Sequence, residues 1–164
     1  LMAGGEIYTN LERGVIDATE WIGPYHDYLM GFQNVAKYYY YPGWHELGTV
    51  LEMLVSKSKF EALPTDLQEI IRTACLRLNR ITPVRLDTMN AQYLPKIQAS
   101  QGVSMRLYPD EVMKTFRANT METIAELTAS DPQSKKIYEA FLDFQKKIVP
   151  WMTISEKAFY QNIL

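Results

Sequence analysis

The sequence contains a single cysteine among 164 residues, and this scarcity excludes several kinds of site. Cys75 has no partner for an intrachain disulfide, a cysteine-based zinc site or a redox pair. Its neighbours form the apolar-periodic run TACLRL, which predicts that Cys75 packs in a core. A domain with a sufficient core needs no disulfides in an oxidising compartment, so cysteine usage leaves the compartment open.

Long apolar runs and a surplus of positive charge are also lacking. No window approaches 18 consecutive apolar residues, which excludes a membrane-spanning helix. The net charge is -2 with a pI near 5.7, and the basic residues are interspersed with acidic ones, which disfavours nucleic-acid binding. The composition that remains, 47% hydrophobic and 22% charged, is that of a globular domain able to bury a core.

Hydrophobic periodicity divides the first part of the chain into short elements that alternate between helix and strand. Four successive tyrosines, for example, favour a strand because their rings suit a pleated surface and their hydroxyls can face a polar cleft. The expected elements are a helix at residues 6–13, strands at 15–23, 37–41 and 49–56, a helix at 26–36 and a helical turn at 60–63.

The second part of the chain predicts longer helices. Thr65 and Gln68 have the spacing of a capping box, and helical composition then continues to about residue 101. Pro83 and Pro95 predict kinks or breaks in that helix. A strand at 103–108 and helices at 109–127, 132–149 and 151–164 follow, with Pro150 as a joint. The pattern predicts a helix-rich α/β chain with a small sheet.

Two acidic residues beside tryptophans are the candidate chemical groups. Glu20 and Trp21 fall at the end of the strand expected at 15–23, and Trp44 is followed by His45 and Glu46. Carboxylates and a backbone carbonyl are oxygen donors of the kind that hard cations prefer. Composition alone favours a plainer interpretation, in which the acids are exposed loop residues and the tryptophans belong to the core.

Two other function classes compete with a binding site. Glu20, Glu46 and His45 have the chemistry for acid–base or metal-assisted hydrolysis, but the chain shows no serine elbow, cysteine–histidine pair, glycine-rich phosphate loop or HExxH helix. A helical interaction domain would account for the amphipathic helices from residue 65 onward. It would leave the two tryptophan-containing loops without a role.

Three motifs resemble one family of transport proteins. Residues 4–8 (GGEIY) and 11–18 (LERGVIDA) resemble the "G…E.Y..LQ.GVVDG" stretch of the solute-binding proteins of tripartite ATP-independent periplasmic (TRAP) transporters. Residues 20–25 (EWIGPY) and 36–46 (AKYYYYPGWHE) resemble the branch that binds 2-oxo or 2-hydroxy monocarboxylates with a cation. The resemblance covers essentially all 164 residues and is strongest from residue 4 to 46.

This resemblance implies a site at which a sodium or calcium ion bridges the protein and the substrate carboxylate. The implied metal ligands are the side chains of Glu20 and Glu46 and the main-chain carbonyl of Trp21. The implied substrate-binding residues are Trp21, Tyr25, Trp44 and His45. For His45, a structural hydrogen-bonding role is an equal alternative.

The resemblance also implies the wider setting. Residues 1–164 would be a single partial domain: the carboxyl-terminal part of a two-lobed, type II periplasmic-binding-protein-like fold with a small mixed sheet. The amino-terminal lobe, a signal peptide, a carboxylate-clamping arginine and a further amide ligand are expected upstream. The implied function is non-enzymatic capture of a 2-oxo acid such as pyruvate, or a 2-hydroxy acid such as lactate, in the periplasm and its delivery to the membrane permease. Residues 151–164 are expected to pack on their own lobe or to hold a homodimer.

Overall fold

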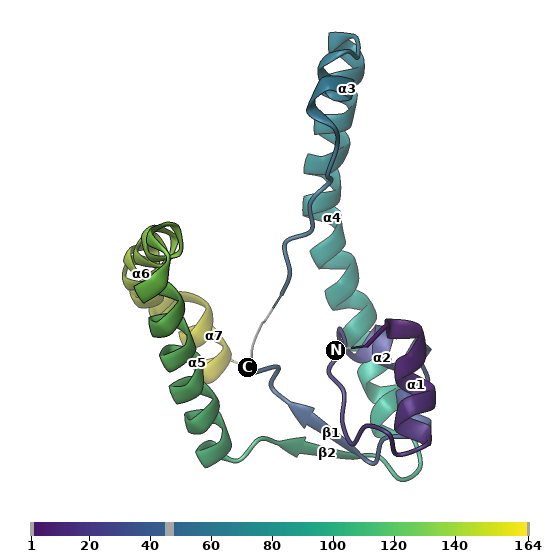
Figure 1. Cartoon of the computed structure of the whole chain (residues 1–164). Coiled ribbons are helices and arrows are strands. Elements are labelled where there is room, and N and C mark those ends of the chain that lie inside the picture. The colour runs from purple at the N-terminus through teal and green to yellow at the C-terminus, as the bar shows by residue number, and fades with distance from the viewer. Residues whose placement is uncertain (1, 45–47, 164) are drawn as a thin grey trace. The chain divides into compact units, whose positions relative to one another are not determined.

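The structure, a computed structural model, describes residues 2–44 and 48–163, and the chain forms two compact units. The first unit is Leu1–Tyr108 and the second is Pro109–Leu164 (Figure 1). Among the described residues, no helix combines the length and the apolar character needed to cross a bilayer.

The first unit contains the elements that position the candidate site. Helices α1 and α2 and the two strands lie near the carboxyl-terminal end of one very long helix, whereas α3 lies at its amino-terminal end (Figure 1). In chain order the elements are α1 (Gly4–Glu12), α2 (Pro24–Leu29), a 3-10 turn (Phe32–Asn34), β1 (Tyr38–Tyr41), α3 (Lys57–Glu61), α4 (Thr65–Gln98) and β2 (Ser104–Leu107).

The two strands form a small parallel sheet. Tyr38 pairs with Ser104 and Tyr41 with Leu107, so the whole of α3 and α4 forms the crossover between them. This confirms the predicted strands at 37–41 and 103–108 and the helix-rich fold with a small sheet. A mixed sheet was expected, however, whereas the sheet within the described residues is parallel.

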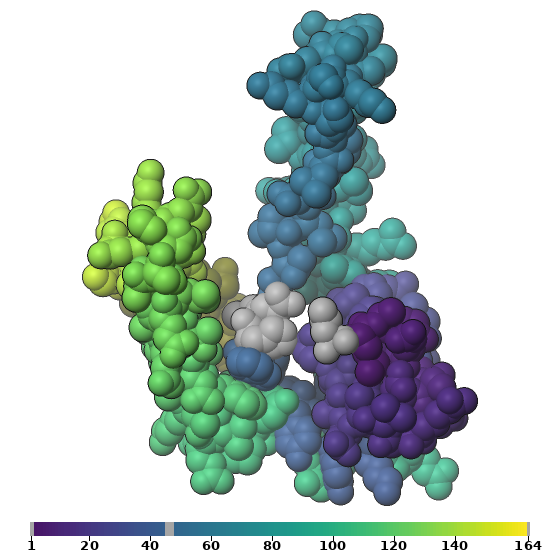
Figure 2. All heavy atoms as spheres, in the orientation of Figure 1, coloured from purple at the N-terminus to yellow at the C-terminus, as the bar shows by residue number. Residues whose placement is uncertain are grey.

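The first unit has a small core, to which α1, the 3-10 turn and the end of α4 each contribute one buried side chain. Its three most buried side chains are Ile7, Phe32 and Ile97, and Ile97 is only 2% exposed. α2 packs along the same part of α4, where Tyr25 and Tyr28 meet Tyr93 edge to face with ring centroids 5.0 and 5.5 Å apart. Figure 2 shows this amino-terminal part of the chain as a dense cluster of purple atoms.

Helix α4 differs from the predicted helix in two respects. It runs unbroken through Pro83 and Pro95, so the expectation of a break at either proline is wrong. The capping box is wrong as well. Pro64 occupies the N-cap position, and the Gln68 side-chain amide donates to the carbonyl of Leu63 at 2.9 Å.

Two predicted strands are absent from the described residues. Residues 15–23 and 49–56 have β-branched and aromatic side chains but form no ladder with a neighbouring strand. Strand propensity mainly reflects packing on a half-buried sheet, and Val50, at 92% exposed, has no such surface to cover. Likewise, the helix expected at 26–36 is divided at Gly31, whose φ of +79° is left-handed, into α2 and the 3-10 turn.

The second unit is a chain of consecutive helices. α5 (Asp110–Ser130) and α6 (Pro132–Met152) are joined at Asp131, whose carboxylate accepts N–H bonds from Gln133 and Ser134 at 3.1 and 3.0 Å. A hydrogen bond from the Ser134 hydroxyl, together with these two backbone bonds, lowers the pKa of Asp131. α6 continues through Pro150, then passes through a π-helical turn (Thr153–Lys157) into α7 (Ala158–Asn162).

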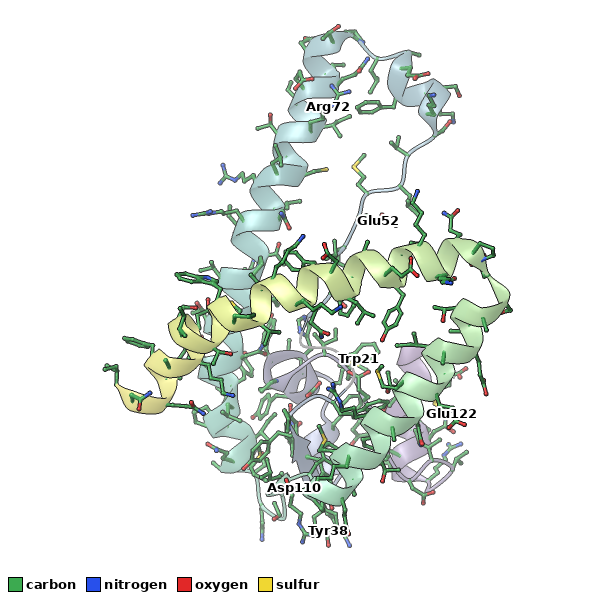
Figure 3. The ribbon with its side chains drawn as sticks, turned by 90° about the vertical axis from the view of Figure 1, so that its left-hand side faces the viewer. Trp21, Tyr38, Glu52, Arg72, Asp110 and Glu122 are labelled. Carbon is green, nitrogen blue, oxygen red and sulfur yellow. The ribbon has the colours of Figure 1, made fainter. Side chains whose placement is uncertain are left out.

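Apolar surface remains exposed at the amino-terminal end of α4. The extended segment before α3 leans on this end through Met53 and Val55, which line an open hollow together with Phe60, Ile71, Arg72, Cys75 and Leu76. Figure 3 shows Arg72 reaching from α4 toward α3, where its guanidinium lies 5.1 Å from the centre of the Phe60 ring. Cys75 is exposed here, so the prediction that it packs in a core is wrong for this chain.

Candidate functional site

The candidate site is built around residues 18–23, an irregular segment between α1 and α2 that we call the site loop. Glu20 lies in an exposed stretch of it, and the Glu20 carbonyl accepts a bond from the Thr19 hydroxyl at 3.1 Å. Of the second predicted cluster, Trp44 is 43% exposed. His45 and Glu46 lie outside the described residues, so their distance from Glu20 is not defined.

The indole of Trp21 is wedged against the amino-terminal helix. A Cβ atom added at Gly4, the first residue of α1, would lie 2.8 Å from the Trp21 ring carbon Cη2. The same ring meets Phe32 edge to face with centroids 6.5 Å apart. The half-buried ring therefore anchors the site loop to α1 and the 3-10 turn (Trp21 is labelled in Figure 3).

A carboxylate that the sequence analysis did not single out holds the end of the site loop. Oδ1 of Asp27, on α2, accepts the backbone N–H groups of Ile22 and Gly23 at 3.3 and 3.2 Å. Oδ2 of Asp27 accepts the hydroxyl of Tyr39, on β1, at 2.6 Å. One side chain thus connects the site loop, α2 and the sheet.

Helix α4 supplies a second attachment. The Oδ1 atom of Asn90 accepts the backbone N–H of Tyr25 at 3.0 Å. Gly23 approaches the same amide so closely that a Cβ atom there would lie 3.3 Å from Asn90 Oδ1, and its φ of +156° is one that glycine tolerates best. The sequence Gly23-Pro24 therefore turns the chain into α2 directly against α4.

The attachment between Asp27 and Tyr39 is partly buried. Burial, the hydrogen bond to Asp27 and the negative charge of that carboxylate all raise the pKa of Tyr39 above its ordinary value. Tyr39 therefore keeps its proton above the pH at which an ordinary tyrosine ionises, and it acts as a hydrogen-bond donor to Asp27.

The structure brings only part of the predicted site together. Trp21 and Tyr25 lie on adjoining segments held by Asp27 and Asn90, and Glu20 precedes them directly. Within residues 2–44 and 48–163, no three histidine, cysteine, aspartate or glutamate side chains gather closely enough to hold a metal ion. The oxygen donors that the site loop offers, a carboxylate and main-chain carbonyls, fit a hard cation completed by groups from elsewhere.

Asp27, Tyr39 and Asn90 are the supporting residues that sequence reasoning missed. An aspartate in the first turn of a helix that begins Gly-Pro was a usable signal, because such side chains commonly accept nearby backbone N–H groups. Nothing in the local sequence indicated Tyr39 or Asn90, since their contacts depend on how distant segments pack.

Comparison with protein families places these features among known proteins. The bacterial extracellular solute-binding proteins, family 7, match residues 1–131. A monocarboxylate 2-oxoacid-binding periplasmic protein from Nostoc is 36% identical over 162 residues, which is 99% of this chain and 44% of the relative.

Two crystal structures match the fold over nearly the whole chain. One is a TRAP periplasmic solute-binding protein from Colwellia psychrerythraea with bound calcium and pyruvate, at a TM-score of 0.92 and 35% identity over 97% of this chain. The other, from Pseudoalteromonas atlantica with bound sodium and pyruvate, has a TM-score of 0.92 and 32% identity over 99% of this chain. This chain covers 48% and 50% of those two proteins, so it spans about half the length of the relatives it matches.

Proposed function

Because this chain belongs to the bacterial extracellular solute-binding proteins of family 7, we propose that it is the carboxyl-terminal half of a periplasmic protein that captures a small organic acid for a TRAP permease. The proposed ligand is a 2-oxo acid such as pyruvate or a 2-hydroxy acid such as lactate. The observation that carries the proposal is the match of nearly the whole chain to two proteins whose crystals hold pyruvate beside calcium or sodium. We call the full-length protein, with this chain as its carboxyl-terminal half, the intact protein.

The proposed cation ligands are the carboxylates of Glu20 and Glu46 and the main-chain carbonyl of Trp21. The local structure supports this choice, because the Trp21 ring is fixed by Gly4 and Phe32 while its backbone lies in an irregular segment outside helix and sheet. A bound sodium or calcium ion would supply positive charge for the ligand carboxylate.

The remaining wall of the proposed pocket is aromatic. We assign it to Trp21, Tyr25, Trp44 and His45. Tyr25 lies in the first turn of α2, just beyond the site loop, and packs on Tyr93, which fixes its position relative to α4. Aromatic walls with a few placed polar groups are typical of small-molecule sites.

The proposed protein binds its acid without transforming it. The relatives are solute-binding proteins, a class that is not enzymatic. Residues 1–164 are proposed to be one partial domain, with a signal peptide and an amino-terminal lobe upstream that supplies the opposite wall. Closure of two lobes around the acid would create the surface that the membrane subunits recognise.

The carboxyl-terminal helices carry apolar residues that need cover. Trp151, Ile154, Phe159 and Ile163 are each more than half exposed. We propose that they pack on their own lobe or hold a homodimer. Light scattering of the intact protein separates these cases. Only a homodimer has twice the mass of the monomer, and the double substitution Trp151→Ser and Ile154→Ser should return that mass to the monomer value.

Calorimetric titration of the intact protein tests the function. Pyruvate, lactate, a longer 2-oxo acid and succinate are each titrated with and without sodium and calcium. We expect cation-dependent binding of a 2-oxo or 2-hydroxy monocarboxylate, with the acid unchanged afterwards by nuclear magnetic resonance. Absence of binding to every acid would leave the helical interaction domain as the better interpretation, and turnover would favour the hydrolase.

A further inference from the structure

We propose that Asp27 is the positioning residue of the site loop: its carboxylate fixes the loop before ligand arrives, so that Glu20 and the Trp21 carbonyl are already placed to receive the cation. This inference rests on the proposed function and assigns a role to a side chain outside the proposed ligand set. The starting observation is that three donors from two separate segments converge on one carboxylate.

The geometry divides the work between the two oxygens. Oδ1 receives both N–H groups at the end of the site loop, from Ile22 and Gly23, which immediately follow the proposed carbonyl ligand Trp21. Oδ2 receives the Tyr39 hydroxyl at 2.6 Å, a short contact typical of hydrogen bonds to a charged acceptor. Because Tyr39 lies on β1, the loop is fixed to the sheet as well as to α2.

Within the described part of the chain, no backbone carbonyl accepts either of these two amides. The site loop belongs to neither helix nor sheet, and Ile22 and Gly23 precede the first helical hydrogen bond of α2, which runs from the Asp27 N–H to the Gly23 carbonyl at 2.9 Å. Without Asp27, each N–H would exchange its partner for water and the loop would sample more conformations. Every cation-binding event would then have to include the free energy of ordering the loop.

The Asn90 contact supports the same function from the other side. It holds the N–H of Tyr25, two residues beyond the anchored pair, against α4. Asp27 and Asn90 therefore fix the loop end in two directions. Of the two, only Asp27 binds the amides next to Trp21, so its loss should affect the cation site more directly.

The first measurement is amide hydrogen exchange at Ile22 and Gly23 in the intact protein without ligand or cation. Asp27→Ala removes Oδ1, the oxygen that accepts both N–H groups, and we expect these two amides to lose their protection while the amides of α4 keep theirs. Asp27→Asn should retain part of the protection, because its amide oxygen can accept the loop N–H groups and its amide nitrogen can donate to Tyr39.

The second measurement is cation-dependent pyruvate binding by calorimetry on the same variants. We expect Asp27→Ala to weaken binding about 10- to 100-fold, the usual effect of removing a group that orients metal ligands. Asp27→Asn and Tyr39→Phe should each weaken it less than Asp27→Ala does. If Asp27→Ala does not fold, which circular dichroism reveals, the decision rests on Asp27→Asn and Tyr39→Phe.

Asp131→Ala is the matched control. Asp131 also accepts three hydrogen bonds, two from backbone N–H groups and one from a hydroxyl, but it caps α6 in the other compact unit. It should change neither loop exchange nor binding. The positioning role is overturned if the wild-type protein binds pyruvate and the Asp27 and Tyr39 variants bind it equally well. If the wild-type protein binds none of the acids, the proposed function fails first, whatever the exchange data show.

Discussion

Gly4 offers a direct test of how the amino-terminal helix supports the site. Gly4 and Gly5 are adjacent in the first turn of α1, and both have ordinary negative φ angles that alanine accepts. A Cβ atom at Gly4 would lie 2.8 Å from the Trp21 ring, whereas one at Gly5 has nothing within 4 Å. Gly4→Ala and Gly5→Ala should therefore change helix propensity by the same amount, but only Gly4→Ala adds a contact with Trp21.

The expected magnitudes follow from these contacts. Replacing glycine by alanine in a helix stabilises it by at most about 1 kcal/mol. At Gly4 the ring must also withdraw until the 2.8 Å contact reaches about 3.4 Å, and its contact with the buried Phe32 resists this. Such overpacking costs about 1–3 kcal/mol. We expect Gly4→Ala to have a free energy of unfolding about 1–3 kcal/mol below that of Gly5→Ala.

Urea denaturation of the intact protein, followed by circular dichroism, measures this difference. Calorimetry on the same two variants shows whether displacement of Trp21 reaches the site, and we expect weaker cation-dependent binding for Gly4→Ala alone. Equal unfolding free energies for the two variants would refute the claim that the Trp21 ring is fixed against α1. Equal affinities with unequal stabilities would mean that the position of the Trp21 ring does not affect cation binding.

Three further predictions concern the site, the core and pH. Changing Glu20 and Glu46 together to glutamine should abolish cation-dependent binding in calorimetry while unfolding stays cooperative, and unchanged affinity would refute the metal assignment. Ile97→Ala should lower the free energy of unfolding by about 2–5 kcal/mol, while Ile70→Ala, at a site 61% exposed, should change it by less than about 0.5 kcal/mol in urea titrations. Because folding raises the pKa of Tyr39, the contribution of Tyr39 to stability should be complete below the ordinary tyrosine pKa of about 10 and decline above it. Tyr39→Phe should weaken this pH dependence in thermal unfolding. An unaltered profile would argue that Tyr39 is not a buried donor.

Local sequence predicted several elements from the pattern of their own residues. The apolar spacing of Ile7 and Leu11 indicated α1, the tyrosine run indicated β1, and Pro109 followed by two acidic residues indicated the start of α5. Each of these patterns records a preference that the final packing does not oppose. The motifs at residues 4–25 also indicated the family, which the comparison confirms.

Contacts between distant segments account for the errors. Residues 15–23 resemble a strand in composition, yet Asp27 and the packing of Trp21 hold their carboxyl-terminal part in an irregular form. Residues 49–56 have strand propensity but no strand beside them among the described residues. Pro83 and Pro95 lie inside α4, although the low helix propensity of proline predicts that the helix would break there.

The sequence indicated which side chains the candidate site offers, but not the contacts that hold them. The identities of Glu20, Trp21 and Tyr25 suggested a carboxylate and aromatic surface at one loop. That the loop is held by Asp27, Tyr39 and Asn90 follows only from the three-dimensional arrangement. All six assigned site residues stay predictions: Glu20, Trp21, Tyr25, Trp44, His45 and Glu46. His45 and Glu46 also lie outside the described residues.

The parallel pairing of β1 with β2 affects the order in which the first unit folds. β1 carries Tyr39, which fixes the site loop through Asp27, but its only strand partner among the described residues is β2, which emerges after the whole of α4. Parallel pairs closed over a long crossover form late, because the chain entropy of the loop must be lost first. The site loop and β1 therefore precede β2 along the chain, and the contact between Asp27 and Tyr39 rests on a strand that is paired only once residues 104–107 are in place.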